Sequence, residues 1–189
     1  MSLIERDFSF NFKYVCNFDV NEIIDIVKDY DKEWHYETDR QQIFPEHSQT
    51  FSVFITKIPL LWQGYGYPYK ICKLPEQIER LEKIVRPIIN SLEAHYNGKN
   101  GRSLVTKLIA GGEIPTHNDN GYYLEGIHRC HIPIITNNQV DFTVNGEVIN
   151  MKVGECYEIN NKIHHRVQNN GEIDRVHLIV DIIPSKMFR

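Results

Sequence analysis

The sequence predicts a mostly β fold with flanking helices, arranged as a double-stranded β-helix, or jelly roll. From residue 101 onward, short apolar segments of strand length follow one another between tight turns, a pattern typical of a sandwich or barrel. Before residue 101, two segments with helical periodicity are expected to cover the outside of one sheet. We therefore expect a single domain over residues 1–189, with flanking strands and helices in 1–100 and the double-stranded β-helix core in 101–183.

The first hundred residues contain two expected strands and two expected helices. Alternation of apolar and polar residues indicates the strands, and apolar residues spaced by three and four indicate the helices. Pro87 lies inside the second helix and is expected to kink or divide it. The stretch 62–70, rich in glycine and tyrosine, is expected to be a loop that packs on the domain rather than a substrate lid. The expected elements are a strand at 8–16, a helix at 19–32, a strand at 50–58 and a helix at 74–98.

The remainder of the chain consists of candidate strands. Asn145-Gly146 between two apolar runs is a strong signal for a hairpin with a type I′ turn. Gly154 and Asn170-Gly171 indicate further tight turns. The candidate strands are 103–110, 127–135, 140–144, 147–152, 155–159, 162–169 and 174–183.

Composition excludes several classes of partner. The formal net charge is -4 and no basic run is present, so we expect no nucleic-acid partner. No apolar stretch is long enough to span a bilayer, and the N-terminus lacks the plan of a signal peptide. None of the four cysteines forms a C-x-x-C pair, which argues against a disulfide framework or a zinc site. Together these features predict a cytoplasmic protein that binds neither nucleic acid nor membrane.

A cluster of histidines indicates a metal site. Six of the nine histidines lie between His117 and His177. In an extended segment, His117 and Asp119 point to the same side and can present a nitrogen and an oxygen to one ion. In the strand at 162–169, His165 shares the apolar face, so His165 should point inward and His164 outward. Two histidines and one carboxylate form a facial triad with open positions, which suits non-haem iron(II).

Further polar residues are expected near this metal. Arg175 lies on the next strand among apolar residues, where a guanidinium is costly to bury without an anionic partner. Its planar fork matches a carboxylate, such as the far end of a diacid like 2-oxoglutarate. The alternative is a structural salt bridge with Asp174 or Glu172. Arg129 and His131 share one face of their strand and form a second polar pair, although a satisfied core histidine is an equal alternative for His131.

The run from 101 to 183 resembles the aspartyl/asparaginyl β-hydroxylase family of iron(II)- and 2-oxoglutarate-dependent oxygenases, which are cupin-like. The similar segments are IPTHNDN (114–120), RCHIPIITN (129–137), VNGEVINMKVGECYEINN (144–161) and HRVQNNGEIDRVHLIVD (165–181). The resemblance implies iron at His117, Asp119 and His165. It also implies 2-oxoglutarate at Arg175, with help from Arg129, His131 and Thr106. With Asp119 present, the chain is similar to the small bacterial members, some of which hydroxylate free amino acids.

The expected activity is therefore that of a dioxygenase that couples decarboxylation of 2-oxoglutarate to C–H hydroxylation. The expected partners are dioxygen and a small polar substrate, a free amino acid or similar metabolite, because the short chain leaves little room for a peptide groove. Three alternatives remain open at this point: a peptidyl Asp/Asn β-hydroxylase, a non-oxygenase metal-binding cupin, and a ligand-binding module. The sequence does not determine the substrate, the carbon hydroxylated or the oligomeric state.

Overall fold

The computed structural model describes residues 9–36, 38–56, 76–119 and 121–188. The expected loop at 62–70 lies outside these ranges. The strands are β1 (Phe12–Asn17), β2 (Thr50–Thr56), β3 (Gly98–Leu108), β4 (Glu113–His117), β5 (His128–Ile135), β6 (Val140–Val144), β7 (Glu147–Ile149), β8 (Glu155–Ile159), β9 (His165–Asn169) and β10 (Arg175–Pro184). The helices are α1 (Asn21–Lys28), α2 (Asp39–Ile43), α3 (Glu76–Tyr96) and α4 (Tyr122–Gly126), with short 3₁₀ turns η1 (Lys32–His35), η2 (Pro45–His47) and η4 (Ser185–Phe188).

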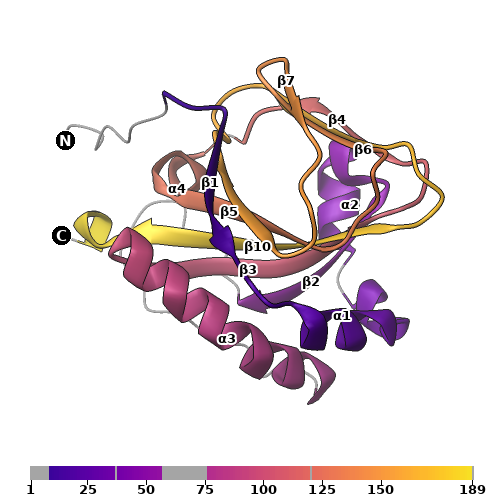
Figure 1. Ribbon diagram of the computed structural model, residues 1–189, viewed down its shortest axis with the longest axis horizontal. Coiled ribbons are helices and arrows are strands. Elements are labelled where there is room, and N and C mark those ends of the chain that lie inside the picture. The colour runs from indigo at the N-terminus through magenta and orange to yellow at the C-terminus, as the bar shows by residue number, and fades with distance from the viewer. Residues whose placement is uncertain (1–8, 37, 57–75, 120, 189) are drawn as a thin grey trace.

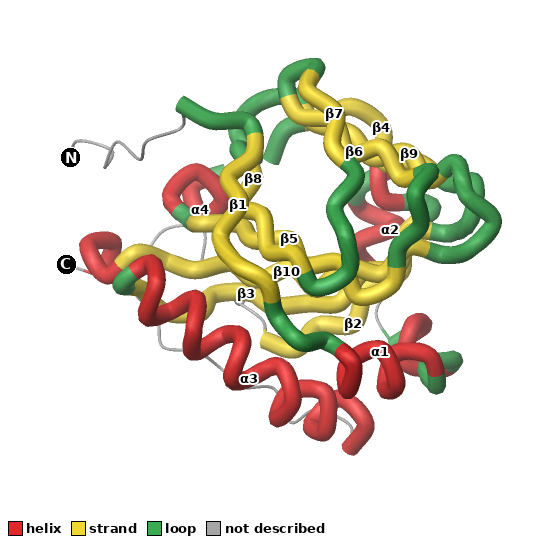
Figure 2. Tube along the Cα trace, viewed as in Figure 1, coloured by secondary structure: helices red, strands yellow, loops and turns green. Residues whose placement is uncertain are grey.

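The described strands form two antiparallel sheets, which confirms the predicted mostly β jelly roll with flanking helices. The six-stranded sheet has the order β1-β8-β5-β10-β3-β2, and the four-stranded sheet has the order β4-β9-β6-β7. Figures 1 and 2 show the smaller sheet facing the larger one across the interior of the domain. β1 and β2, which precede residue 101, form the two edges of the larger sheet, so the N-terminal part of the chain completes the fold.

The hairpin between β6 and β7 confirms the turn predicted from Asn145-Gly146. Val144 and Glu147 are paired across the hairpin. Asn145 has φ of 50° and Gly146 has φ of 82°, the left-handed values that a type I′ turn requires at both central positions. This turn fixes the register of β6, which in turn pairs with β9 and places Val144 opposite His165.

Helices cover the outer face of the larger sheet, as the sequence predicts (Figure 1). Apolar residues of α1 and α3 pack against the outward side chains of β10, including Val176, Leu178 and Val180. α3 runs without interruption from Glu76 to Tyr96 with Pro87 inside it, so of the two expected effects, a kink or a division of the helix, the division does not occur. Pro87 is exposed, and its ring therefore displaces no core side chain.

The alternation of side chains along β10 creates two different environments. Its outward residues belong to the apolar layer under the helices. Its inward row contains Arg175, His177, Ile179 and Asp181, and the three polar residues of this row are at most 1% exposed. Burial of charged and polar side chains is costly unless they are paired. The interior of the jelly roll is therefore the place where a polar site is built.

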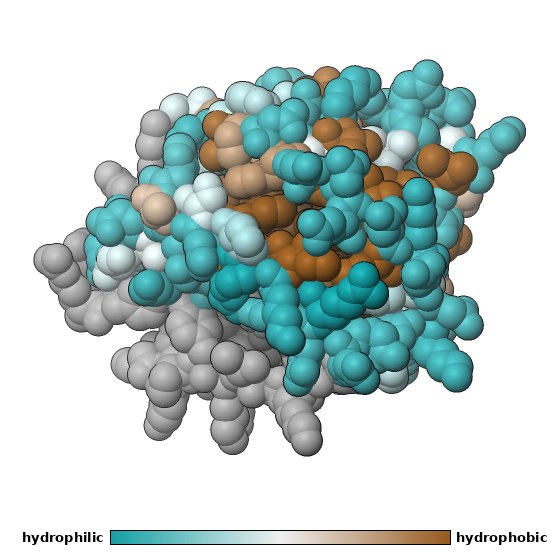
Figure 3. Space-filling view, turned by 60° about the horizontal axis from the view of Figure 1, so that its bottom comes forward, coloured by the Kyte–Doolittle hydropathy of each residue, from teal (hydrophilic) through white to brown (hydrophobic). Residues whose placement is uncertain are grey.

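No described helix is long and apolar enough to cross a bilayer. On the face shown in Figure 3, hydrophilic residues surround a central apolar patch.

Candidate metal centre

His117, Asp119 and His165 converge inside the jelly roll, as the sequence predicts. Each offers one ligand atom, and the three atoms all lie within 4.8 Å of one another. His117 and His165 are paired residues on β4 and β9, with ring centroids 4.3 Å apart. His165 is buried and His164 is exposed, which confirms that the side chain of His165 points inward and that of His164 points outward, as predicted. Two imidazoles and one carboxylate in this arrangement match the facial triad of non-haem iron(II) sites.

The backbone orients both imidazoles toward the same point. Nδ1 of His117 lies 2.8 Å from the carbonyl oxygen of Pro115, and Nδ1 of His165 lies 2.9 Å from that of Ile163. Because a carbonyl only accepts, each Nδ1 carries the proton and donates it, and each Nε2 keeps its lone pair for a metal. Such hydrogen bonds from the second ring nitrogen are typical of metal-binding histidines.

An irregularity in β4 sets the position of His117. Ile114 pairs with Val167 and His117 pairs with His165, so β4 has one residue more than β9 between these pairs. Such a bulge bends its strand and redirects side chains, and bulges are common beside active sites. After β4, the backbone N–H of Asp119 donates to the carbonyl of Asn161 at 3.0 Å, which holds the carboxylate beside the two histidines.

The electrostatic surroundings keep this triad ready for a cation. Burial alone would raise the pKa of Asp119, but the charge of Arg129, with smaller contributions from the two histidines and Arg102, holds that pKa well below its usual range. Burial lowers the pKa of His165, although Asp119 opposes this effect. A deprotonated carboxylate and neutral imidazoles are the forms that bind metal. The donor set therefore fits iron(II).

A second group of buried polar residues lies on the inner face of the larger sheet. Arg175 is 1% exposed, its Nη2 donates to Nδ1 of His177 at 2.7 Å, and its guanidinium lies over the ring of Phe142. Thr106 is paired with His177 on the neighbouring strand. Asp174, the alternative partner of Arg175 that the sequence suggested, instead forms an ion pair with Lys107 at 3.8 Å. We refer to Arg175, His177 and Thr106 as the Arg175 cluster.

His131 belongs to the same region and has a distinctive environment. It is 6% exposed, and its ring packs edge-on against Phe142 and His177. Within the described part of the chain, neither of its ring nitrogens has a hydrogen-bond partner. Burial and the nearby charge of Arg175 lower its pKa well below the usual value, so the ring is neutral. A neutral buried imidazole with open nitrogens favours the ligand-binding alternative for His131 over that of a satisfied core residue.

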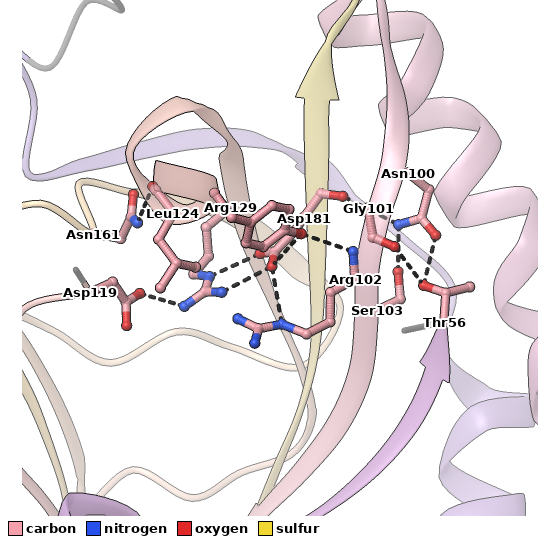
Figure 4. Close-up of polar contacts among 11 residues, drawn as sticks. Thr56, Asn100, Gly101, Arg102, Ser103, Asp119, Leu124, Arg129, Asn161 and Asp181 are labelled. Atoms are coloured by element: carbon pink, nitrogen blue, oxygen red, sulfur yellow. Dashed lines mark hydrogen bonds and ion pairs between the residues drawn. The ribbon is translucent and has the colours of Figure 1, made fainter. Parts of the chain in front are cut away.

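Arg129 links the triad to the larger sheet. Its Nη1 contacts the carboxylate of Asp119, and its Nε and Nη2 each donate to the carboxylate of Asp181 at 2.9 Å (Figure 4). Asp181 also forms an ion pair with Arg102, whose Nε lies 3.3 Å from Oδ2. The hydroxyl of Tyr123 donates to the same oxygen at 3.0 Å. Arg129 thus lies beside the metal ligands, as predicted, but it is paired with two carboxylates of its own protein.

Three residues of this network were not predicted from the sequence: Arg102, Tyr123 and Asp181. Strand alternation was an available signal for two of them, because Asp181 shares a face with Arg175 and Arg102 shares a face with Thr106. Tyr123 lies on the short helix α4, for which the sequence carries no clear pattern. His177 is the hydrogen-bond partner of Arg175.

Comparison with known proteins identifies a matching family and a shared fold. The model of the family described as aspartyl/asparaginyl beta-hydroxylase matches residues 22–184. A search of curated proteins finds no match.

Among solved structures, the similarity is confined to the fold. An oxidoreductase of the 2OG-Fe(II) oxygenase family from Burkholderia pseudomallei aligns with a TM-score of 0.52 and 12% identity, over 71% of this chain and 66% of that chain. A viral collagen prolyl hydroxylase from Paramecium Bursaria Chlorella virus-1 aligns with a TM-score of 0.52 and 10% identity, over 92% and 96%. A prolyl-4-hydroxylase from Pseudomonas putida aligns with a TM-score of 0.50 and 8% identity, over 92% of each chain.

Proposed function

This chain belongs to the aspartyl/asparaginyl β-hydroxylase family, and we propose that it hydroxylates a C–H bond of a small polar substrate, a free amino acid or a metabolite of similar size. The resemblance to this family implies iron(II) and 2-oxoglutarate as cofactors, and the donor set of the site fits that metal, so the chain acts as a 2-oxoglutarate-dependent hydroxylase. The observation that carries the proposal is the convergence of His117, Asp119 and His165 inside the jelly roll.

In the proposed mechanism, these three residues hold the metal through two imidazole nitrogens and one carboxylate oxygen. Bound iron(II) supplies the chemistry that couples decarboxylation of 2-oxoglutarate with dioxygen, giving succinate and carbon dioxide, to transfer of one oxygen atom into the substrate. Arg175 pairs with the far carboxylate of 2-oxoglutarate, because its buried planar fork matches that group. His177 positions Arg175, and the open nitrogens of His131 and the hydroxyl of Thr106 complete the co-substrate site.

A small substrate is favoured by the way in which the site is enclosed. The polar residues that face the metal region, Arg129, His131 and Arg175, are each at most 6% exposed. His47 of η2 packs against His117 with ring centroids 5.6 Å apart, which covers one side of the triad. An enclosed site with a few placed polar groups suits a small molecule better than an extended peptide.

The test is a succinate-release assay of the iron-loaded protein with free amino acids and with short peptides that contain Asp or Asn. We expect at least one free amino acid to stimulate succinate formation, with one hydroxylated product formed per succinate. If peptides alone stimulate turnover, the chain is a peptidyl Asp/Asn β-hydroxylase. If neither class stimulates succinate formation above the substrate-free rate, the small-substrate proposal fails and a metal-binding cupin or ligand-binding module takes its place.

A further inference from the structure

We propose that Arg102 binds a carboxylate of the substrate and thereby selects carboxylate-bearing amino acids. This inference rests on the proposed function and names the substrate class for the same site. Three observations support the inference. One end of the Arg102 side chain is anchored, its other end is open, and the charges around it favour an anion.

One end of Arg102 is held by two neighbours, Asp181 and Tyr123. Its Nε lies 3.3 Å from the carboxylate of Asp181. Its backbone N–H donates to the hydroxyl of Tyr123 at 2.9 Å, and its guanidinium lies 5.7 Å from the centre of the Tyr123 ring. Tyr123 can approach so closely because Gly101 has no side chain, since a Cβ there would lie 2.5 Å from the tyrosine hydroxyl. The guanidinium is therefore pre-positioned, which reduces the entropy cost of binding a ligand.

The other end of Arg102 is open. Within the described ranges, its two terminal nitrogens have no hydrogen-bond or ion-pair partner, and its side chain is 29% exposed. Figure 4 shows these two nitrogens extending toward the side of the network where Asp119 lies. Two parallel N–H groups of an arginine form the fork that matches a carboxylate. The fork of Arg102 thus points to the side of Asp119 and is available to a ligand.

The charges around Arg102 favour an anion once a metal is bound. Two guanidiniums, Arg102 and Arg129, face two carboxylates, Asp119 and Asp181. When Asp119 binds the metal, the cation neutralises the negative charge of its carboxylate. Asp181 then faces both guanidiniums alone, and it is already held by two bonds from Arg129. One positive charge is left over, and it resides on the more exposed arginine.

This anion site is separate from the co-substrate site. Along the inner face of the larger sheet, the paired residues Ile179 and Leu104 lie between the Arg175 cluster and the group formed by Arg102 and Asp181. Both are apolar and nearly completely buried. The sheet therefore presents two cationic positions on the two sides of an apolar pair. We assign Arg175 to 2-oxoglutarate and Arg102 to the substrate.

The test compares each standard L-amino acid with its α-carboxamide, which lacks only the negative charge. Binding is measured by calorimetry with the protein loaded with manganese(II) and 2-oxoglutarate, and turnover is measured as succinate release with iron(II). We expect the amino acid that binds best to bind about 10- to 100-fold more tightly than its amide. Arg102→Gln should remove this difference while the affinity for 2-oxoglutarate and manganese is kept. Arg102→Lys should keep part of it, because lysine retains the charge without the fork.

Arg166→Gln is the matched control, since Arg166 is exposed on β9, and it should behave as the wild type. The inference is overturned, and the proposed function is retained, if acid and amide bind equally well or if Arg102→Gln keeps the preference. It is also overturned if Arg102→Gln weakens 2-oxoglutarate itself, because Arg102 would then belong to the co-substrate site. If the preference depends on Arg102 but the carboxylate is that of an aspartyl side chain in a peptide, with no free amino acid bound, both this inference and the proposed function fail.

Discussion

At the scale of single residues, the neighbours His164 and His165 provide the sharpest test of the metal site. His165 is buried with its Nδ1 held by Ile163, whereas His164 is exposed. His165→Ala should abolish iron binding and turnover, because one of three ligands is lost. His164→Ala should leave both nearly unchanged. Metal content after dialysis, together with succinate release, checks this prediction, and the reverse result would show that the register of β9 is different in solution.

Arg175 allows a test of the co-substrate site that is independent of the metal. Arg175→Ala should weaken 2-oxoglutarate binding by roughly 2–5 kcal/mol, the range found when one partner of a buried charge pair is truncated. Manganese affinity should change little, since Arg175 is not among the residues that form the candidate metal site. Lysine at this position should restore only part of the affinity. Calorimetric titration with 2-oxoglutarate measures these effects, and normal binding by the alanine variant would shift the assignment to Arg129.

The buried His177 should make the stability of the protein depend on pH. Burial and the charge of Arg175 lower the pKa of His177 well below its ordinary value. The unfolded chain therefore takes up the proton first, and the stability that neutral His177 provides is present above about pH 6.5 and lost as the pH falls. His177→Asn keeps an acceptor for Arg175 without titrating.

The stability difference between wild type and His177→Asn should therefore shift by about 1 kcal/mol in favour of the variant between pH 7.5 and pH 5.5. Urea unfolding at the two pH values measures this shift. Ser91→Ala, a substitution of a residue that does not titrate at an exposed position, is the control and should show the same difference from wild type at both values. An unchanged difference for His177→Asn would mean that His177 takes up its proton as readily in the folded protein as in the unfolded chain.

At the scale of elements, Pro87 is a local weakness in α3. A proline inside a helix removes one backbone hydrogen bond and clashes with the carbonyl four residues earlier. Here the helix continues from Glu76 to Tyr96 because its buried residues, such as Leu81, Val85 and Ile89, pack on the sheet. Pro87→Ala should therefore raise the free energy of unfolding by about 1–2 kcal/mol, which is the gain in helix propensity less the added entropy of the unfolded chain.

Urea unfolding measures that change as well. Ser91→Ala, at an exposed position in the same helix, is the matched control and should alter stability by no more than about 0.5 kcal/mol. A destabilised Pro87→Ala variant would indicate that the proline relieves a strain in the middle of α3.

The strands show why part of the site could be predicted from the sequence. The direction of a side chain follows from alternation along its own strand, which is local information. It placed His165 inward, and His165 is buried in the structure. The contact between Arg129 and Asp119 depends on how two sheets face each other, and the role of Tyr123 depends on the missing side chain of Gly101. Neither relation is encoded in the spacing of residues along the chain.

At the scale of the whole molecule, the metal site joins the two sheets. His117 and His165 come from the four-stranded sheet, and Arg129 and Asp181 come from the six-stranded sheet. The contact between Asp119 and Arg129 bridges them. Backbone hydrogen bonds fix both imidazoles, and pairing of β4 with β9 holds them side by side. The fold therefore supplies the geometry of the site before any ion contributes to it.

From this arrangement we expect removal of the metal to destabilise the protein without unfolding it. A metal present at about 100 times its dissociation constant adds roughly 2.7 kcal/mol to the stability of the folded state. For a chain of this size, that corresponds to a decrease of about 5–10 °C in Tm on chelation. The near-UV circular dichroism at 25 °C should persist, because Arg129 still neutralises Asp119 when the cation is gone. His165→Ala is the control, and its Tm should not respond to the chelator. Loss of the near-UV signal on chelation would show instead that the ion, and not the pairing of strands and the bridge between sheets, holds this end of the jelly roll together.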